Sequence, residues 1–269
     1  MSLLLGRLAP LVPLAWSVVY LSTIVFVVRL SVRKKYVRLS TPIICTAGGK
    51  KEGLRYYKMG SAVASPLQAL TAVLWGEAVT GKLKKTLGSS ESITEDDLKR
   101  VQIGTICGMF SAVFAYLTAH FSILTHEAIH DVVFVLCMIF GWIWCIAVTY
   151  YTNNNSPATR AHHNLFDVRR LLLCVNWICI LSAALLMEYG RRIKQKLKKK
   201  QQFFDKDNFW AEPDSGVASS SRGKVDTLLP WDPCIQRAAI LSYVALAAFV
   251  GLVISTTVEL QQQSFQDAQ

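Results

Sequence analysis

The clearest chemical pattern in the chain is a short polar stretch that matches H-E-x-x-H. It reads His126-Glu127-Ala128-Ile129-His130. On a helix, residues four apart share a face, so His126 and His130 could hold a zinc ion while Glu127 activates water as a general base. A catalytic zinc also needs a third protein ligand and an open water position. The pattern therefore predicts, as one alternative, a zinc-dependent intramembrane hydrolase whose third ligand comes from Asp167, His162, His163 or Glu188.

The same stretch also has a purely structural interpretation. Glu127 and Asp131 stand where an apolar run begins, and the positive end of a helix dipole favours carboxylates there. His126 then falls in a tight turn before the helix. We favour this interpretation, with no metal and no cofactor, because only three positions of the pattern are fixed and nothing singles out a third ligand.

The elements that must position these residues are long, uncharged apolar runs. Hydrophobic residues make up 52% of the 269 residues, and charged ones only 17%, against about 25% charged in an average soluble protein. A membrane-spanning helix needs about 20 apolar residues. Six runs qualify: 11–28, 60–76, 101–125, 132–151, 171–187 and 238–258. The second contains Pro66 and Gln68 but is kept, because membrane helices tolerate proline.

These runs predict an all-α polytopic membrane protein, a six-helix transmembrane bundle forming one domain over residues 1–269. The net charge of +11 would also suit a nucleic-acid binder, but such a protein spreads its apolar residues in amphipathic stripes. Here the charges lie between charge-free blocks. We therefore expect the lipid bilayer, and no nucleic acid, as a partner.

The distribution of basic residues predicts the orientation of the bundle. The first, third and fifth connections hold 20 Lys and Arg residues, and all other segments hold nine. The positive-inside rule places the richer loops in the cytosol and both termini outside. The sequon Asn154-Asn155-Ser156 would then face outward, which predicts glycosylation of Asn154.

The fifth connection, residues 191–237, is predicted to be a basic and partly disordered loop. Its first ten residues include seven basic ones, and the remainder is poor in apolar residues. Each basic residue near an anionic membrane surface contributes about 1 kcal/mol of binding. One hypothesis is thus a contact with anionic lipids; the alternative is a solvated flank that sets topology. The residues concerned are Arg191, Arg192, Lys194, Lys196, Lys198, Lys199 and Lys200.

Polar residues inside the expected spans are few: Gln68, Gln102, His120 and Asn176. A proton relay or ion pathway normally shows charged residues in mid-span. A small-solute transporter stays open as a further alternative, since simple carriers need no charged site. Gly104 and Gly108 form a small-xxx-small pair, which permits close helix approach, and we expect it to serve packing within the bundle.

Several short motifs resemble a known family. Ala119-His120-Phe121 is followed after a short linker by Ile129-His130-Asp131. Further similar motifs are Leu11-Val12-Pro13 with Trp16, Thr41-Pro42-Ile43 with Gly48-Gly49, and Arg169-Arg170. On these residues the sequence resembles the damage-regulated autophagy modulator (DRAM)-like family of six-span membrane proteins, whose relatives include a factor in GPI-anchor lipid remodelling.

The resemblance implies a non-enzymatic, multi-pass endomembrane protein that acts in autophagy or membrane-lipid remodelling. It implies residence in the lysosome, Golgi, ER or plasma membrane. It also implies that both termini lie in the cytosol, opposite to the orientation that the charge count predicts. The family has no established catalytic residues to transfer. His130 and Asp131 are accordingly predicted to form a functional polar pair without an assigned chemical role, and protein partners are not predicted.

Overall fold

The computed structural model describes residues 8–34, 44–49, 51–87, 95–154, 160–200 and 232–266. Within these ranges the chain forms helices and no strand, so the predicted all-α class is confirmed. The helices are α2 (Leu11–Arg33), α3 (Ile44–Gly49), α4 (Lys51–Leu87), α5 (Glu95–His120), α6 (Glu127–Asn154), α7 (Arg160–Lys200) and α8 (Asp232–Gln266).

Six of these helices are long and apolar enough to cross a membrane, which confirms the six expected spans. Their bounds are Leu11–Arg33, Glu52–Lys84, Glu95–His120, Glu127–Tyr151, Asn164–Ile193 and Pro233–Gln261. Helix α4 continues through Pro66, as expected for a membrane helix whose neighbours compensate the missing N–H.

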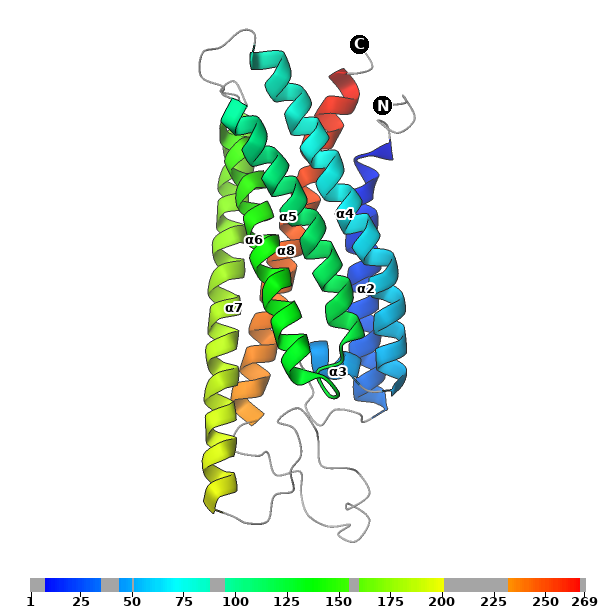
Figure 1. Cartoon of the computed structure of the whole chain (residues 1–269), viewed down its shortest axis with the longest axis vertical. Coiled ribbons are helices and arrows are strands. Elements are labelled where there is room, and N and C mark those ends of the chain that lie inside the picture. Colours follow the sequence, from blue (N-terminus) through cyan, green and yellow to red (C-terminus); the bar gives the residue numbers. More distant parts are fainter. Residues whose placement is uncertain are drawn as a thin grey trace.

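The six long helices form a closed ring. Each packs on its neighbour in sequence, and α8 returns to contact both α2 and α4. Figure 1 shows the start of α2 and the end of α8 together at one end of the bundle, and α3 with the α5–α6 turn at the other. Because the ring closes, side chains from helices far apart in sequence converge on its axis.

The turn between α5 and α6 begins earlier than the apolar run indicated. The third span was expected to reach residue 125, but α5 ends at His120. The cause is Ser122, whose carbonyl accepts the N–H groups of Thr125 and His126 at 3.1 and 2.8 Å. Its hydroxyl accepts the N–H of Leu124 at 3.2 Å. Such local hydrogen bonds compete with helix continuation, so the chain reverses here.

Gly104 and Gly108 lie where α5 packs closely on both of its neighbours. A Cβ atom at Gly104 would lie 2.7 Å from the Cβ of Ala147 on α6. One at Gly108 would lie 2.6 Å from the Cβ of Ala72 on α4. Both distances are far below van der Waals contact, so only glycine permits these approaches. The expected use of this pair within the bundle is confirmed.

Helix α7 corrects the predicted start of the fifth loop. It spans 41 residues, about 60 Å at 1.5 Å per residue, whereas the hydrocarbon core is about 30 Å thick. Residues 191–200 are therefore the end of a helix rather than the start of a loop. Lys, Arg, Gln and Leu are all good helix formers, which explains the continuation. The rest of that predicted loop, residues 201–231, lies outside the described residues, as does Thr41-Pro42-Ile43.

Candidate functional site

A cavity of about 220 Å³ occupies the axis of the ring. All seven described helices contribute side chains to its wall, which is mostly apolar. His130 and Trp142 both line it from α6, and their separation of twelve positions corresponds to about 18 Å along the helix. The cavity is therefore long and narrow, with polar side chains near both ends.

His130 lies at the end of the cavity next to α3 and the α5–α6 turn. It is 3% exposed, and its Nδ1 lies 2.7 Å from the carbonyl oxygen of Phe121. A carbonyl only accepts hydrogen bonds, so Nδ1 carries the proton. Cys45 of α3 lines the same cavity. His130 thus connects the α5–α6 loop to the first helical turn of α6.

Asp131 also lines the cavity, beside an ion-pair cluster on the outer side of α6 and α7. Arg191 lies 3.4 Å from the carboxylate of Glu127, 3.8 Å from that of Asp131 and 3.8 Å from that of Glu188. Arg192 lies 2.9 Å from Glu188. The structure therefore brings the predicted pair His130 and Asp131 to the cavity and places the carboxylate of Glu127 against Arg191.

The remaining residues of the zinc hypothesis are spread over the molecule. His126 is exposed and precedes α6, with its Nδ1 2.8 Å from the Thr125 hydroxyl, which confirms its place in the turn. Asp167 precedes Arg191 on α7 by about 36 Å of helix, at the opposite end of the bundle. Across the described ranges no group of three or more His, Cys, Asp or Glu is arranged to hold a metal. The side chains of His162 and His163 lie outside the described residues, and zinc binding stays a prediction.

Two other sequence predictions fall partly outside the described residues. Asn154 is the last residue of α6, but its side chain is not described. The same holds for Lys194, Lys196, Lys198, Lys199 and Lys200, of which the structure gives the helical backbone alone. Glycosylation and anionic-lipid contact therefore stay predictions.

Buried polar groups line the other end of the cavity, deep in the bundle. Gln68 donates to the Ser111 hydroxyl at 3.3 Å, and the Trp142 indole donates to the side-chain amide oxygen Oδ1 of Asn176 at 2.9 Å. Trp16 is 1% exposed, and its indole N–H has no hydrogen-bond partner among the described residues. Gln68 and Asn176 were singled out from the sequence, but nothing there indicated that they share one cavity.

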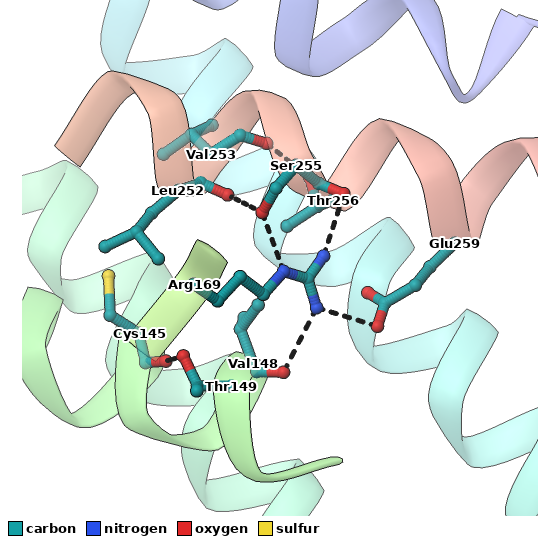
Figure 2. A network of polar contacts seen from close by, with 9 residues as sticks. All are labelled: Cys145, Val148, Thr149, Arg169, Leu252, Val253, Ser255, Thr256 and Glu259. Atoms are coloured by element: carbon teal, nitrogen blue, oxygen red, sulfur yellow. Dashed lines mark hydrogen bonds and ion pairs between the residues drawn. The ribbon is translucent and has the colours of Figure 1, made fainter. Parts of the chain in front are cut away.

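A second polar centre, which was not predicted from the sequence, lies near the start of α7. Arg169 is fully buried. Its Nε donates to the Ser255 hydroxyl at 2.7 Å, its Nη2 to the Ser255 carbonyl at 2.8 Å, and its Nη1 to Glu259 at 2.9 Å and to the Val148 carbonyl at 3.3 Å. Figure 2 shows this guanidinium between α6 and α8. Nothing in the sequence distinguishes Arg169 from the adjacent Arg170, which is exposed.

A closed ring of six apolar helices around an internal cavity defines an integral, multi-pass membrane protein. Residues 9–263 match the family model described as Frag1/DRAM/Sfk1/Cwh43P N-terminal domain, and the chain belongs to this family. The DRAM-like resemblance drawn from short motifs is thereby confirmed. No curated protein and no solved structure matches the chain significantly.

Proposed function

We propose that this protein is a non-enzymatic, multi-pass endomembrane protein that acts in membrane-lipid regulation, with anionic lipids as its partner. The observation that carries the proposal is the basic end of α7. Figure 1 shows this end extending beyond α6 and α8. A helix of about 60 Å outruns the hydrocarbon core and places its last turns at or beyond the headgroups.

The charges of this helix end favour an anionic surface. Arg191 and Arg192 are partnered by carboxylates of α6 and α7. The next two turns add five lysines and no acidic residue, from Lys194 to Lys200. At about 1 kcal/mol for each basic residue near an anionic surface, five lysines support a contact that selects anionic over neutral lipid and weakens with added salt.

Lipid enrichment around the full-length protein tests this proposal. The protein is extracted from membranes of mixed anionic and neutral phospholipids, and the retained lipids are quantified by mass spectrometry at low and high salt. We expect anionic lipid to be enriched, and the enrichment to disappear when the five lysines are replaced by glutamine. Replacement of the same five by arginine retains the charge and is the matched control. Equal enrichment in the glutamine variant contradicts the proposal.

Roles in autophagy and lipid remodelling, and residence in lysosome, Golgi or ER, are proposed from the family resemblance. Cells lacking the protein should change in membrane-lipid composition or in autophagic flux. The wild-type chain should restore either one, and the glutamine variant should not. Full restoration by the glutamine variant would separate the cellular role from the basic end of α7.

A further inference from the structure

The central cavity has the features of a binding site for a lipid from the bilayer. We propose that it binds one molecule of an uncharged, single-chain lipid, with a hydrogen-bond-accepting group of that lipid at Trp16. This site is separate from the anionic contact of α7, which lies outside the bundle. Four observations support it: the lateral opening of the cavity, its charge, its buried donor and its size.

The cavity reaches the lipid-facing surface between α6 and α7. Phe134 of α6 and Ala184 of α7 both line it, and both are exposed, Phe134 by 38%. Since these residues lie within membrane-spanning helices, the opening faces acyl chains rather than water. A lipid can therefore enter sideways from the bilayer without crossing the headgroup region.

The charge of the wall disfavours an anionic group at the deep end of the cavity. Among the described residues that line the cavity there is no lysine or arginine, and Asp131 is the acidic one. A carboxylate or phosphate at the deep end, away from His130, would lack a cationic partner, and burial of an unpaired charge is very unfavourable. The polar groups at the deep end, including Gln68, Ser111 and Asn176, are neutral. They suit a hydroxyl or an ester carbonyl.

Trp16 supplies a hydrogen-bond donor at the deep end. It lines the cavity and is 1% exposed, and its N–H lacks a partner in the described part of the chain. An unsatisfied buried donor carries a desolvation penalty, which an acceptor oxygen on a bound lipid relieves. The indoles of Trp75 and Trp144 also lack a partner among the described residues, but they do not line the cavity.

The volume favours one flexible chain over a rigid ring system. Pockets for drug-sized ligands measure about 300–1,000 Å³, and this cavity is smaller, at about 220 Å³. Its walls run for about 18 Å along α6. A single acyl chain can follow such a narrow path, whereas a sterol needs a broader one.

Photolabelling of the purified full-length protein tests the site. The probe is a monoacylglycerol with a diazirine in its chain and an alkyne handle. We expect labelled peptides to map to lining residues of α6 and α8, and unlabelled monoacylglycerol to compete better than cholesterol or a free fatty acid. Labelling confined to outward-facing residues, or stronger competition by cholesterol or by the fatty acid, would overturn the proposal.

Four variants make the test specific. Ala183 is 3% exposed and lines the cavity, so the larger side chain in Ala183→Leu should fill the cavity and abolish labelling. If this variant does not fold, Ala115→Leu serves as a second cavity-filling variant. Ala62 is exposed on α4, and Ala62→Leu should label like the wild type. Trp16→Phe removes the donor and should weaken binding about twofold to tenfold, the value of one net hydrogen bond. Labelling that both filling variants retain, or unchanged affinity in Trp16→Phe, contradicts the proposal.

This test is independent of the anionic contact. The glutamine variant of α7 should retain full cavity labelling, since no described residue of α7 after Met187 lines the cavity. Ala183→Leu should in turn retain the enrichment of anionic lipids. Either proposal can thus fail while the other stands.

Discussion

Arg169 and Glu259 form a buried ion pair between α7 and α8, with Nη1 and Oε1 2.9 Å apart. The two residues are 90 positions apart in the chain. Desolvation of two charges is expensive, and it is offset here by additional hydrogen bonds from the guanidinium to Ser255 and to the Val148 carbonyl. The pair therefore fixes the register of α8 against α7, and through Val148 against α6.

Loss of one partner of this pair should strongly destabilise the bundle. Arg169→Met leaves Glu259 buried without its guanidinium, and breaking a buried pair costs about 3–5 kcal/mol. Arg170→Met alters an exposed neighbour and should change stability by less than about 0.5 kcal/mol. Unfolding of the purified variants in detergent measures both. The double variant Arg169→Met with Glu259→Met removes both charges and should recover much of the lost stability. Similar stability of the Arg169→Met and Arg170→Met variants would contradict a structural role for the pair.

The close packing of Gly108 against Ala72 can be tested by a rescue experiment. Gly108→Ala places a methyl group 2.6 Å from the Cβ of Ala72, and overpacking of this kind costs about 1–3 kcal/mol. Ala72→Gly removes the opposing methyl, so the double variant should unfold at a higher temperature than Gly108→Ala alone. Gly251→Ala is the control, because its nearest neighbour is the flexible Leu172 side chain at 3.2 Å. Additive losses in the double variant would contradict this contact.

His130 should stabilise the turn through its protonated Nδ1. His130→Phe keeps a ring that can stack on Phe134 but removes the donor to the Phe121 carbonyl. A buried polar group without its partner costs about 1–3 kcal/mol. His126→Phe, at the exposed start of the same motif, should have a much smaller effect. Limited proteolysis at the turn and thermal unfolding measure the difference, and equal effects at the two histidines would contradict it.

Metal analysis separates the two interpretations of the H-E-x-x-H stretch. Because Glu127 contacts Arg191 and His126 is exposed in a turn, we expect gently purified protein to contain zinc well below one equivalent. Elemental mass spectrometry of wild type and His130→Ala measures this. One zinc per chain that is lost in His130→Ala would instead establish the hydrolase alternative.

The charge distribution makes a prediction about orientation. With 20 basic residues in loops one, three and five, a tag after Gln269 should be detected only from the non-cytosolic side. The same orientation exposes Asn154 to glycosylation, so Asn154→Gln should remove a glycosidase-sensitive shift in mobility. A cytosolic tag, with no such shift, would reverse the orientation and place the basic end of α7 outside the cytosol.

The fold could be predicted because its main determinant is local. Uninterrupted apolar runs such as 11–28 and 132–151 indicate a membrane-spanning helix, whichever helices pack against them. The bounds were less predictable. Ser122 ended α5 early through hydrogen bonds of its own carbonyl and hydroxyl, while the lysine-rich end of α7 continued as a helix although its composition resembled a loop.

The candidate site was predicted only in part, because it depends on which helices meet. His130 and Asp131 could be singled out from their motif, but their cavity includes Trp16, from the first span, and Phe249, from the last. Arg169 and Arg170 are adjacent and chemically alike, yet the first is buried and the second exposed. Only the 100° step between successive helical positions, together with the place of α8, distinguishes them.

The partnership between Arg169 and α8 also has a consequence for biosynthesis. When α7 enters the membrane, Ser255 and Glu259 have not yet been translated, and an arginine in an inserted helix costs up to about 2.5–3.5 kcal/mol. Until the last helix arrives, the guanidinium lacks its partners on α8, and from the first turns of the span it can reach the headgroups. A chain that stops before residue 255 therefore leaves Arg169 without Ser255 and Glu259, and we expect such a chain to be less stable in the membrane.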